Sequence, residues 1–325
     1  GSGNIIVTGI GGKAGVSNAD SNQAGVEIRA AIDNSTKHSQ VKATGNGTIL
    51  IKGTGGSGAL STTSNNQATG IRVISGQTNP IDSENGTITL EGTSGYNGGG
   101  PGILIQSPIS STNGTITLKA LQSTAGTPGL NGNIEIQSTV TTDADIIIES
   151  LGAVTQTAAI TADGLGLQGT GTFTLTNTSN NVSEIAAGSS GSRIGALSYF
   201  DTDDLTIGTV NPTGIYSSGD IKIETGTGDI NITENISTSS TSSDAIILNA
   251  GKSSSAGTST GGDILVTGTP TLTTGTNGIV KLFSGSVAQS TGLTSISDNN
   301  YNGLDETSSL PSLTNGTINT FFREP

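Results

Sequence analysis

The sequence predicts an all-β fold of the β-solenoid class, in which short strands stack in successive coils. Three observations predict it. Short apolar segments alternate with tight turns along almost the whole chain; 50 of the 325 residues are Gly and only 31% are hydrophobic; aromatic residues make up 3%, and Trp, Cys and Met are absent. A compact globular core of this size normally draws on large side chains. Here Ile, Leu, Val and Thr must fill the interior.

The segment 219–233 shows the repeating unit. Apolar and polar residues alternate within it, and successive side chains of a strand point to opposite sides, so one set faces inward and the other outward. The four residues 225–228 separate its two copies. We predict that the isoleucines are buried and stacked, namely Ile221, Ile223, Ile230 and Ile232. We predict that the polar residues between them are exposed, namely Lys222, Glu224 and Asn231.

Further copies of the unit run through the first half of the chain. Strands are predicted at residues 5–7 and 26–28, and others begin near Thr48, Ile71, Thr87, Ile103, Thr115, Asn133 and Asp145. Their spacing is too short for a helix between every pair, which excludes a βαβ arrangement. It suits several strands per coil of about 20 residues. The Asn-Gly pairs 46–47, 85–86 and 113–114 are interpreted as corners between solenoid faces rather than as hairpin turns.

The pattern divides the chain into two parts. Residues 1–292 are predicted to form the solenoid, with a looser pattern at 151–198. Residues 293–325 break the pattern with Tyr301, Pro311, Phe321 and Phe322, which predicts an irregular cap or docking segment. The first predicted strand has no polar cap before it, so we expect its coil to be covered by another chain or by residues of a longer parent.

Charge and hydropathy exclude several partners. The net charge is −13, the pI is about 4.3, and the 12 basic residues are scattered. Nucleic acid and anionic membrane surfaces both require clustered Lys and Arg, so neither is an expected partner. No stretch of the sequence is apolar enough to cross a membrane. The lack of cysteine identifies no compartment.

The densest group of carboxylates is Asp201, Asp203 and Asp204. Paired carboxylates can serve acid–base chemistry or bind Ca²⁺, which makes these residues a weak calcium candidate. The single histidine, His38, is far away in sequence, and no nucleophile or metal-ligand cluster accompanies the group. We interpret it as a solvated acidic turn and predict no catalytic site and no cofactor. A carbohydrate-active β-helix enzyme stays a distant third alternative.

The run 205–251 contains degenerate Gly-Ile repeats, notably Leu205-Thr206-Ile207-Gly208, Gly228-Asp229-Ile230-Asn231-Ile232 and Ile246-Ile247-Leu248-Asn249-Ala250-Gly251. This run resembles the repeats of filamentous-haemagglutinin-type exoproteins, the large adhesins of Gram-negative bacteria. The resemblance implies a right-handed parallel β-helix, secretion across the outer membrane, and a role as an adhesin or its shaft. The family's secretion domain carries an Asn-Pro-Asn motif, whereas Asn79-Pro80 and Asn211-Pro212 are followed by Ile81 and Thr213. The resemblance therefore fits a shaft.

Two functions follow from these observations, both extracellular. The first is a non-enzymatic shaft or adhesive segment of a large bacterial surface protein, with the loops 92–100 and 252–262 contacting glycans or proteins of a host or neighbouring cell. The second is a structural subunit that stacks end to end with other copies into a filament or sheath. The axial repeat of a filament, seen by electron microscopy, would distinguish them.

Overall fold

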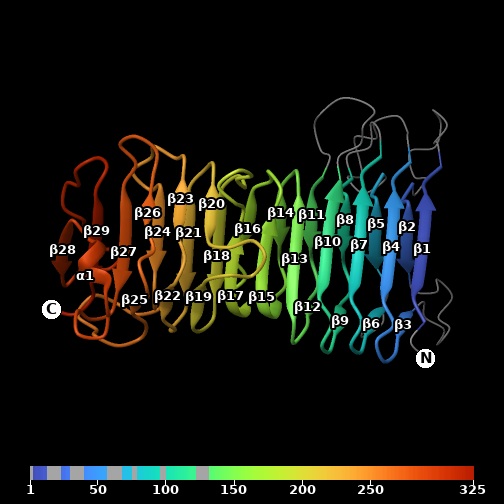
Figure 1. Ribbon diagram of the computed structural model, residues 1–325, viewed down its shortest axis with the longest axis horizontal. Helices are drawn as coiled ribbons and strands as arrows, with labels where there is room; N and C mark the ends of the chain where they lie inside the picture. Colours follow the sequence, from blue (N-terminus) through green and yellow to red (C-terminus); the bar gives the residue numbers. More distant parts are fainter. Residues whose placement is uncertain are drawn as a thin grey trace. The chain divides into compact units, whose positions relative to one another are not determined.

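The computed structural model describes residues 3–12, 23–29, 40–56, 68–74, 79–95, 100–121 and 132–325 (Figure 1). The pairings between its named strands are parallel, and strands pair with their equivalents in neighbouring coils. The predicted fold class, a parallel β-helix, is therefore confirmed. The chain forms two compact units, Gly1–Asp163 with Gly169–Gly171, and Gly164–Gln168 with Thr172–Pro325.

Each coil of the first unit carries three strands, which form three stacked lines (Figure 1). The first line holds β1 (Ile5–Ile10), β4 (Ile49–Thr54), β7 (Ile88–Thr93), β10 (Ile116–Leu121) and β13 (Asp145–Ser150). The second line holds β2 (Val26–Arg29), β5 (Ile71–Ile74), β8 (Ile103–Ile105), β11 (Ile134–Ile136) and β14 (Val154–Gln156). The third holds β3 (Val41–Ala43), β6 (Ile81–Ser83), β9 (Ile109–Ser111), β12 (Val140–Thr141) and β15 (Ile160–Gln168), whose last residues belong to the second unit.

The coils of this unit are longer than the sequence predicted. The register places equivalent isoleucines side by side in the order Ile5, Ile49, Ile88, Ile116 and Ile146. These steps are 44, 39, 28 and 30 residues, so the expected coil of about 20 residues is wrong. Three strands and their loops complete one turn, which takes more residues than the spacing of the strands indicates.

The Asn-Gly pairs mark corners, as predicted. Gly47, Gly86 and Gly114 stack on one another between a short strand and the long strand that follows it, and a Cβ at Gly86 would collide with the carbonyl oxygen of Gly47. A Cβ at Gly114 would likewise meet the oxygen of Gly86. The preceding asparagines form their own ladder, since Asn113 Nδ2 donates to Asn85 Oδ1 at 2.7 Å. Glycine recurs at this corner because successive coils approach there by backbone.

The second unit continues the same pattern of stacked lines. One line holds β16 (Phe173–Leu175), β18 (Leu197–Asp201), β21 (Ile221–Thr225), β24 (Ile246–Asn249), β27 (Val280–Ser284), β29 (Ile318–Phe322) and β28 (Asn299–Asn302). The other strands are β17 (Asn181–Ala187), β19 (Leu205–Ile207), β20 (Ile215–Ser217), β22 (Ile230–Ile232), β23 (Ile236–Thr238), β25 (Ile264–Val266) and β26 (Leu272–Thr273). A single-turn helix, α1 (Leu293–Ile296), follows β27.

Strand alternation places the predicted inward residues in the core. The four isoleucines predicted as inward in β21 and β22 are all fully buried. Of the residues predicted to be exposed, Lys222 and Asn231 are only partly exposed, and for Glu224 the prediction is wrong, because just 5% of it is exposed. Its side chain does lie on the outer face. That face is itself covered, as described below.

Residues 293–325 contain regular structure. Strand β29 pairs with β27, and β28 pairs with β29, so the line of strands continues into this segment. Phe321 and Phe322 are fully buried, and Arg323 is buried while donating to the carbonyl oxygens of Ala250 and Gly262. These contacts fix the returning chain to the coils that precede it. The region 151–198 holds strands β14 to β17 and the start of β18.

Candidate functional site

The acidic group predicted from the sequence lies where strand β18 ends. Asp203 and Asp204 are exposed in the turn that follows the strand, as a solvated turn requires. Asp201, the last residue of β18, is fully buried, and for this residue the solvated interpretation is wrong. The reason is the alternation of β18: Leu197, Tyr199 and Asp201 occupy successive inward positions.

Asp201 is held by three donors. The Tyr199 hydroxyl donates to its Oδ2 at 2.6 Å, the Val182 N–H donates to the same oxygen at 3.0 Å, and the Asp203 N–H donates to Oδ1 at 3.2 Å. Burial raises the pKa of Asp201 from 3.8 to about 7, against the opposing effect of these hydrogen bonds. Burial, together with the nearby Asp201 carboxyl, also raises the pKa of Tyr199 well above its ordinary value. The group ties the end of β18 to β17 from inside the core.

The other two carboxylates have separate partners. Asp203 Oδ2 accepts from Asn181 Nδ2 at 3.0 Å, and Asp204 Oδ1 accepts from the Asp229 N–H at 2.8 Å. Each thus joins its turn to a neighbouring coil. Across the described part of the chain, no three or more His, Cys, Asp and Glu side chains form a group that could hold a metal ion. The calcium candidate therefore gains no support from the geometry.

A different part of the second unit is built more elaborately. The segment 303–311, here called the C-terminal arm, returns over the outer face of strands β21, β24 and β27. The register aligns four outward residues in one row, Glu224, Asn249, Phe283 and Phe321, and each of them is at most 5% exposed. Side chains that point away from the core are therefore buried a second time, beneath the arm and the neighbouring Tyr301.

Charged groups fasten the arm. Glu306 Oε1 accepts from Lys222 Nζ at 2.5 Å and its Oε2 accepts from Asn249 Nδ2 at 3.0 Å. Glu224 accepts from Lys252 Nζ at 2.6 Å and forms an ion pair with Lys222 at 3.1 Å. Burial alone would raise the pKa of Glu306, but the hydrogen bonds and positive charge of Lys222 hold that pKa below its ordinary value.

The loop 252–262 contributes to the same attachment. The Ala256 N–H donates to Asp305 Oδ2 at 2.8 Å, and the Gly257 N–H donates to the Arg323 carbonyl at 2.7 Å. Although burial acts in the opposite direction, the Ala256 N–H and the donors of Thr307 and Ser308 lower the pKa of Asp305 to about 2. The loop that the sequence marked as a contact region is thus engaged with the arm.

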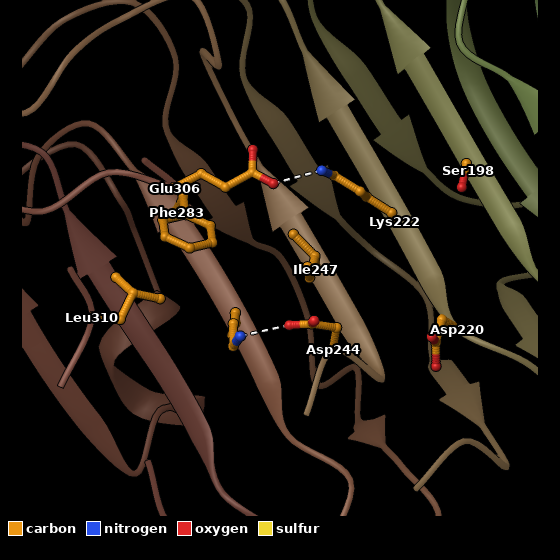
Figure 2. Close-up of a pocket in the computed structure, with 9 residues that line it drawn as sticks. Ser198, Asp220, Lys222, Asp244, Ile247, Phe283, Glu306 and Leu310 are labelled. Carbon is orange, nitrogen blue, oxygen red and sulfur yellow. Dashed lines mark hydrogen bonds and ion pairs between the residues drawn. The ribbon is translucent and has the colours of Figure 1, made fainter. Parts of the chain in front are cut away.

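Beside the arm lies a groove of about 470 Å³ (Figure 2). Its walls carry two ion pairs, Lys222 with Glu306 at 2.5 Å and Lys281 with Asp244 at 2.5 Å. The register puts Ile247 between the two lysines, and Figure 2 shows its side chain between the two ion pairs. Leu310 from the arm and Phe283 from β27 complete an apolar strip. This is a polar groove with an apolar floor.

The sequence contains one signal for this covered region, which did not enter the prediction. Ile247, Phe283 and Phe321 are apolar residues at outward positions, where an uncovered solenoid face normally carries polar ones. Nothing near Glu306 or Leu310 indicates on which strands the arm would settle. His38, and the residues 96–99 of the loop 92–100, lie outside the described residues.

Comparison of the chain with protein-family models, with curated proteins and with solved structures gives no match. Within the described ranges, the structure contains no helix that combines the length and the hydropathy needed to span a bilayer.

Proposed function

We propose that this chain is a non-enzymatic β-solenoid that serves as a shaft or adhesive segment of a large bacterial surface protein. The observation that carries the proposal is the parallel, in-register stacking of each coil on the next, with inward rows of Ile, Leu and Val that are fully buried. In such an architecture a coil contacts only its neighbours, so coils extend a molecule without changing its cross-section. The Gly-Ile repeats of residues 205–251 support the same assignment through their resemblance to exoprotein repeats.

The charged outer face of the first unit is a second argument for a shaft. Lys52, Glu91, Lys119 and Glu149 form one row across four coils, and ion pairs join Lys52 to Glu91 and Lys119 to Glu149, each at 2.7 Å. Charges of alternating sign make a face that is soluble and has little net field. Contacts with glycans or proteins of another cell would then come from loops rather than from this face.

A structural subunit that stacks with other copies into a filament or sheath is the second candidate. It is favoured by strand β1, in which Ile6 is 68% exposed and Ile10 is 80% exposed. Among the described strands β1 pairs only with β4, and a parallel strand of a second copy, or of a preceding coil, could pair with its other edge.

Electron microscopy of the purified chain and of the native material tests both candidates. A shaft predicts single particles without an axial repeat, and a filament subunit predicts a regular repeat. The variant Ile5→Lys with Val7→Lys should abolish filaments, because a stacked copy would bury these inward residues, whereas Ile6→Lys, at an outward position of the same strand, should not. Recovery of the native protein from the cytoplasm after cell fractionation, out of reach of added protease, would contradict both candidates.

The non-enzymatic part of the proposal has its own test. The chain is incubated with acidic polysaccharides, and new reducing ends or unsaturated products are measured. We expect none, and we expect Asp203→Asn and Asp204→Asn to change only charge, because both carboxylates bond to neighbouring turns. Turnover that these substitutions remove would overturn it.

A further inference from the structure

The groove beside the C-terminal arm has features of a ligand site that a purely structural role does not require. Its volume of about 470 Å³ falls within the range of roughly 300 to 1,000 Å³ that is typical of small-molecule sites. The arm forms one wall through Glu306 and Leu310, and the sheet forms the floor and the other wall. The arm therefore makes the outer face concave at this place.

The charged groups that line the groove already have partners. Lys222 is paired with Glu306, Lys281 is paired with Asp244, and Asp220 accepts from the hydroxyls of Ser240 and Ser242. An ionic ligand would have to compete with these pairs for either sign of charge. The paired groups can still form further hydrogen bonds, since an ammonium has three donors and a carboxylate has about four acceptor positions. A neutral ligand with many hydroxyls could use that capacity without breaking a pair.

The floor of the groove adds an apolar surface to these polar groups. Ile247 and Leu310 are each partly exposed, and Ile247 lies between the two ion pairs (Figure 2). A pyranose ring has hydroxyls around its edge and apolar C–H groups on its faces. An apolar strip between polar rims matches that pattern, because the ring face can lie on the strip while hydroxyls reach Asp244 on one side and Glu306 on the other.

We propose that this groove binds a short neutral oligosaccharide. The face of the ring lies over Ile247, Asp244 and Glu306 accept hydrogen bonds from hydroxyls, and Lys222 and Lys281 donate to hydroxyl oxygens. The proposal goes beyond the shaft function and does not depend on it. Failure of the shaft proposal appears in microscopy and cell fractionation, whereas failure of this one appears in ligand titrations.

The test is a titration of the full chain, by calorimetry and by NMR, with maltotriose, cellotriose and chitotriose, and with trigalacturonate as the charged comparison. We expect at least one neutral trisaccharide to bind with a Kd of about 1 mM or below, the usual strength of a small open site. The affinity should change less than twofold between low salt and about 0.5 M NaCl, because no net charge is neutralised.

Two variants localise the binding. Ile247→Trp fills the floor and should weaken binding at least tenfold, and Asp244→Asn should weaken it several-fold while keeping an acceptor beside Lys281. The matched control is Ile147→Trp in β13, which also replaces a partly exposed outward isoleucine and should leave affinity unchanged. Thermal unfolding of each variant confirms that it is folded.

Three results would overturn the proposal. The first is no binding by any neutral trisaccharide at about 10 mM. The second is unchanged affinity in a folded Ile247→Trp protein. The third is tighter, salt-sensitive binding of trigalacturonate, which would mean that the groove recognises an anion.

Discussion

Two outer faces of this protein arise from the same strand alternation and end in different environments. In the first unit, the row Lys52, Glu91, Lys119 and Glu149 faces outward with all four side chains between 25% and 46% exposed. In the second unit, the outward row Glu224, Asn249, Phe283 and Phe321 is at most 5% exposed. The C-terminal arm, together with Tyr301 and Lys252, accounts for the difference. The rows show that alternation decides which face a side chain takes, while a distant segment decides whether that face is surface.

The composition of the two rows follows from that difference. The first row contains only charges, paired between coils, as suits an uncovered face. The second contains two phenylalanines whose ring centroids are 5.0 Å apart, with Tyr301 stacked on Phe321 at 5.2 Å. Its one charged member, Glu224, is paired with Lys222 and Lys252. The covered face thus behaves as a small second core on the outside of the coil.

The largest expected loss of stability comes from a substitution in the interior of the coil, and it is the reference for substitutions on both outer faces. Ile223→Asp should lower the free energy of unfolding by more than about 4 kcal/mol, because it buries an unpaired charge within an apolar row. Thr174→Asp, at an exposed outward position of β16, should cost less than about 0.5 kcal/mol. Denaturant unfolding measures both. Similar losses from the two variants would contradict the assignment of inner and outer faces.

The covered face is tested by truncating an outward aromatic residue. Phe283→Ala should cost about 3 to 5 kcal/mol, as in a core, because the ring is buried and stacked on Phe321. Leu50→Ala, at a partly exposed outward position of β4, should cost under about 1 kcal/mol. If Phe283→Ala were as mild as Leu50→Ala in denaturant unfolding, the arm would not cover this face in solution.

The sequence alone could predict which face of a strand a side chain occupies, but not whether that face is covered. Period-2 alternation identified the inward isoleucines of β21 and β22 and the parallel stacking, because both are local consequences of short strands separated by tight turns. The coil length was missed, since the number of strands per coil depends on loops whose paths leave no periodic signal. The arm was missed for a related reason. Glu306 meets Lys222 across 84 residues, and neither residue's neighbours in sequence indicate the other.

The sequence also predicts only part of the environment of the acidic group Asp201, Asp203 and Asp204. Asp203 and Asp204 were correctly expected to be exposed, because turn residues between strands are solvated. Asp201 occupies an inward position by the same alternation that placed Tyr199, so its burial was within reach of the pattern. The raised pKa of Asp201 could not be predicted from the pattern, because it depends on how completely the neighbouring coils exclude water.

Asp201 gives the interior a pH dependence that the outer rows lack. Its folded-state pKa of about 7 lies above its ordinary 3.8, so the folded state binds this proton more tightly than the unfolded state does. The associated stability is fully present below about pH 4 and is lost as pH rises to about 7, by roughly 4 kcal/mol at most. Denaturant unfolding at intervals from pH 4 to pH 8 measures the slope.

Two variants assign that slope to Asp201. Asp201→Asn should flatten the slope, because an amide does not titrate in this range. It should also lower stability at pH 4, since the amide NH2 group, unlike the hydroxyl oxygen of the protonated acid, cannot accept a hydrogen bond from the Val182 or Asp203 N–H. Tyr199→Phe removes a donor to the charged form, which raises the pKa of Asp201 further and moves the loss toward higher pH. An identical slope in wild type and in Asp201→Asn would show that another group is responsible.

A smaller effect is expected where the arm is fastened. Glu306→Gln keeps the shape of the side chain but removes its charge from Lys222, and should cost about 1 kcal/mol, because both groups are partly exposed to solvent. Hydrogen exchange at residues 303–311 should accelerate in the variant. Ser309→Ala, on an exposed arm residue outside this ion pair, is the control and should accelerate exchange less at 303–306. Unchanged protection in Glu306→Gln would mean that packing alone holds the arm.

The smallest effect is expected on the uncovered face. A double-mutant cycle with Lys119→Ala and Glu149→Ala should give a coupling of about 0.2 to 1 kcal/mol, because about a third of each side chain is exposed and water screens the pair. Raising the salt to about 0.5 M NaCl should remove most of it, since exposed charges are screened over a few ångströms. The cycle is measured by denaturant unfolding at both salt concentrations. A coupling above about 2 kcal/mol that resists salt would mean that water is excluded from this row too. Some partner would then cover the first unit's face in solution as the arm covers the second's, and the two faces would differ only in what covers them.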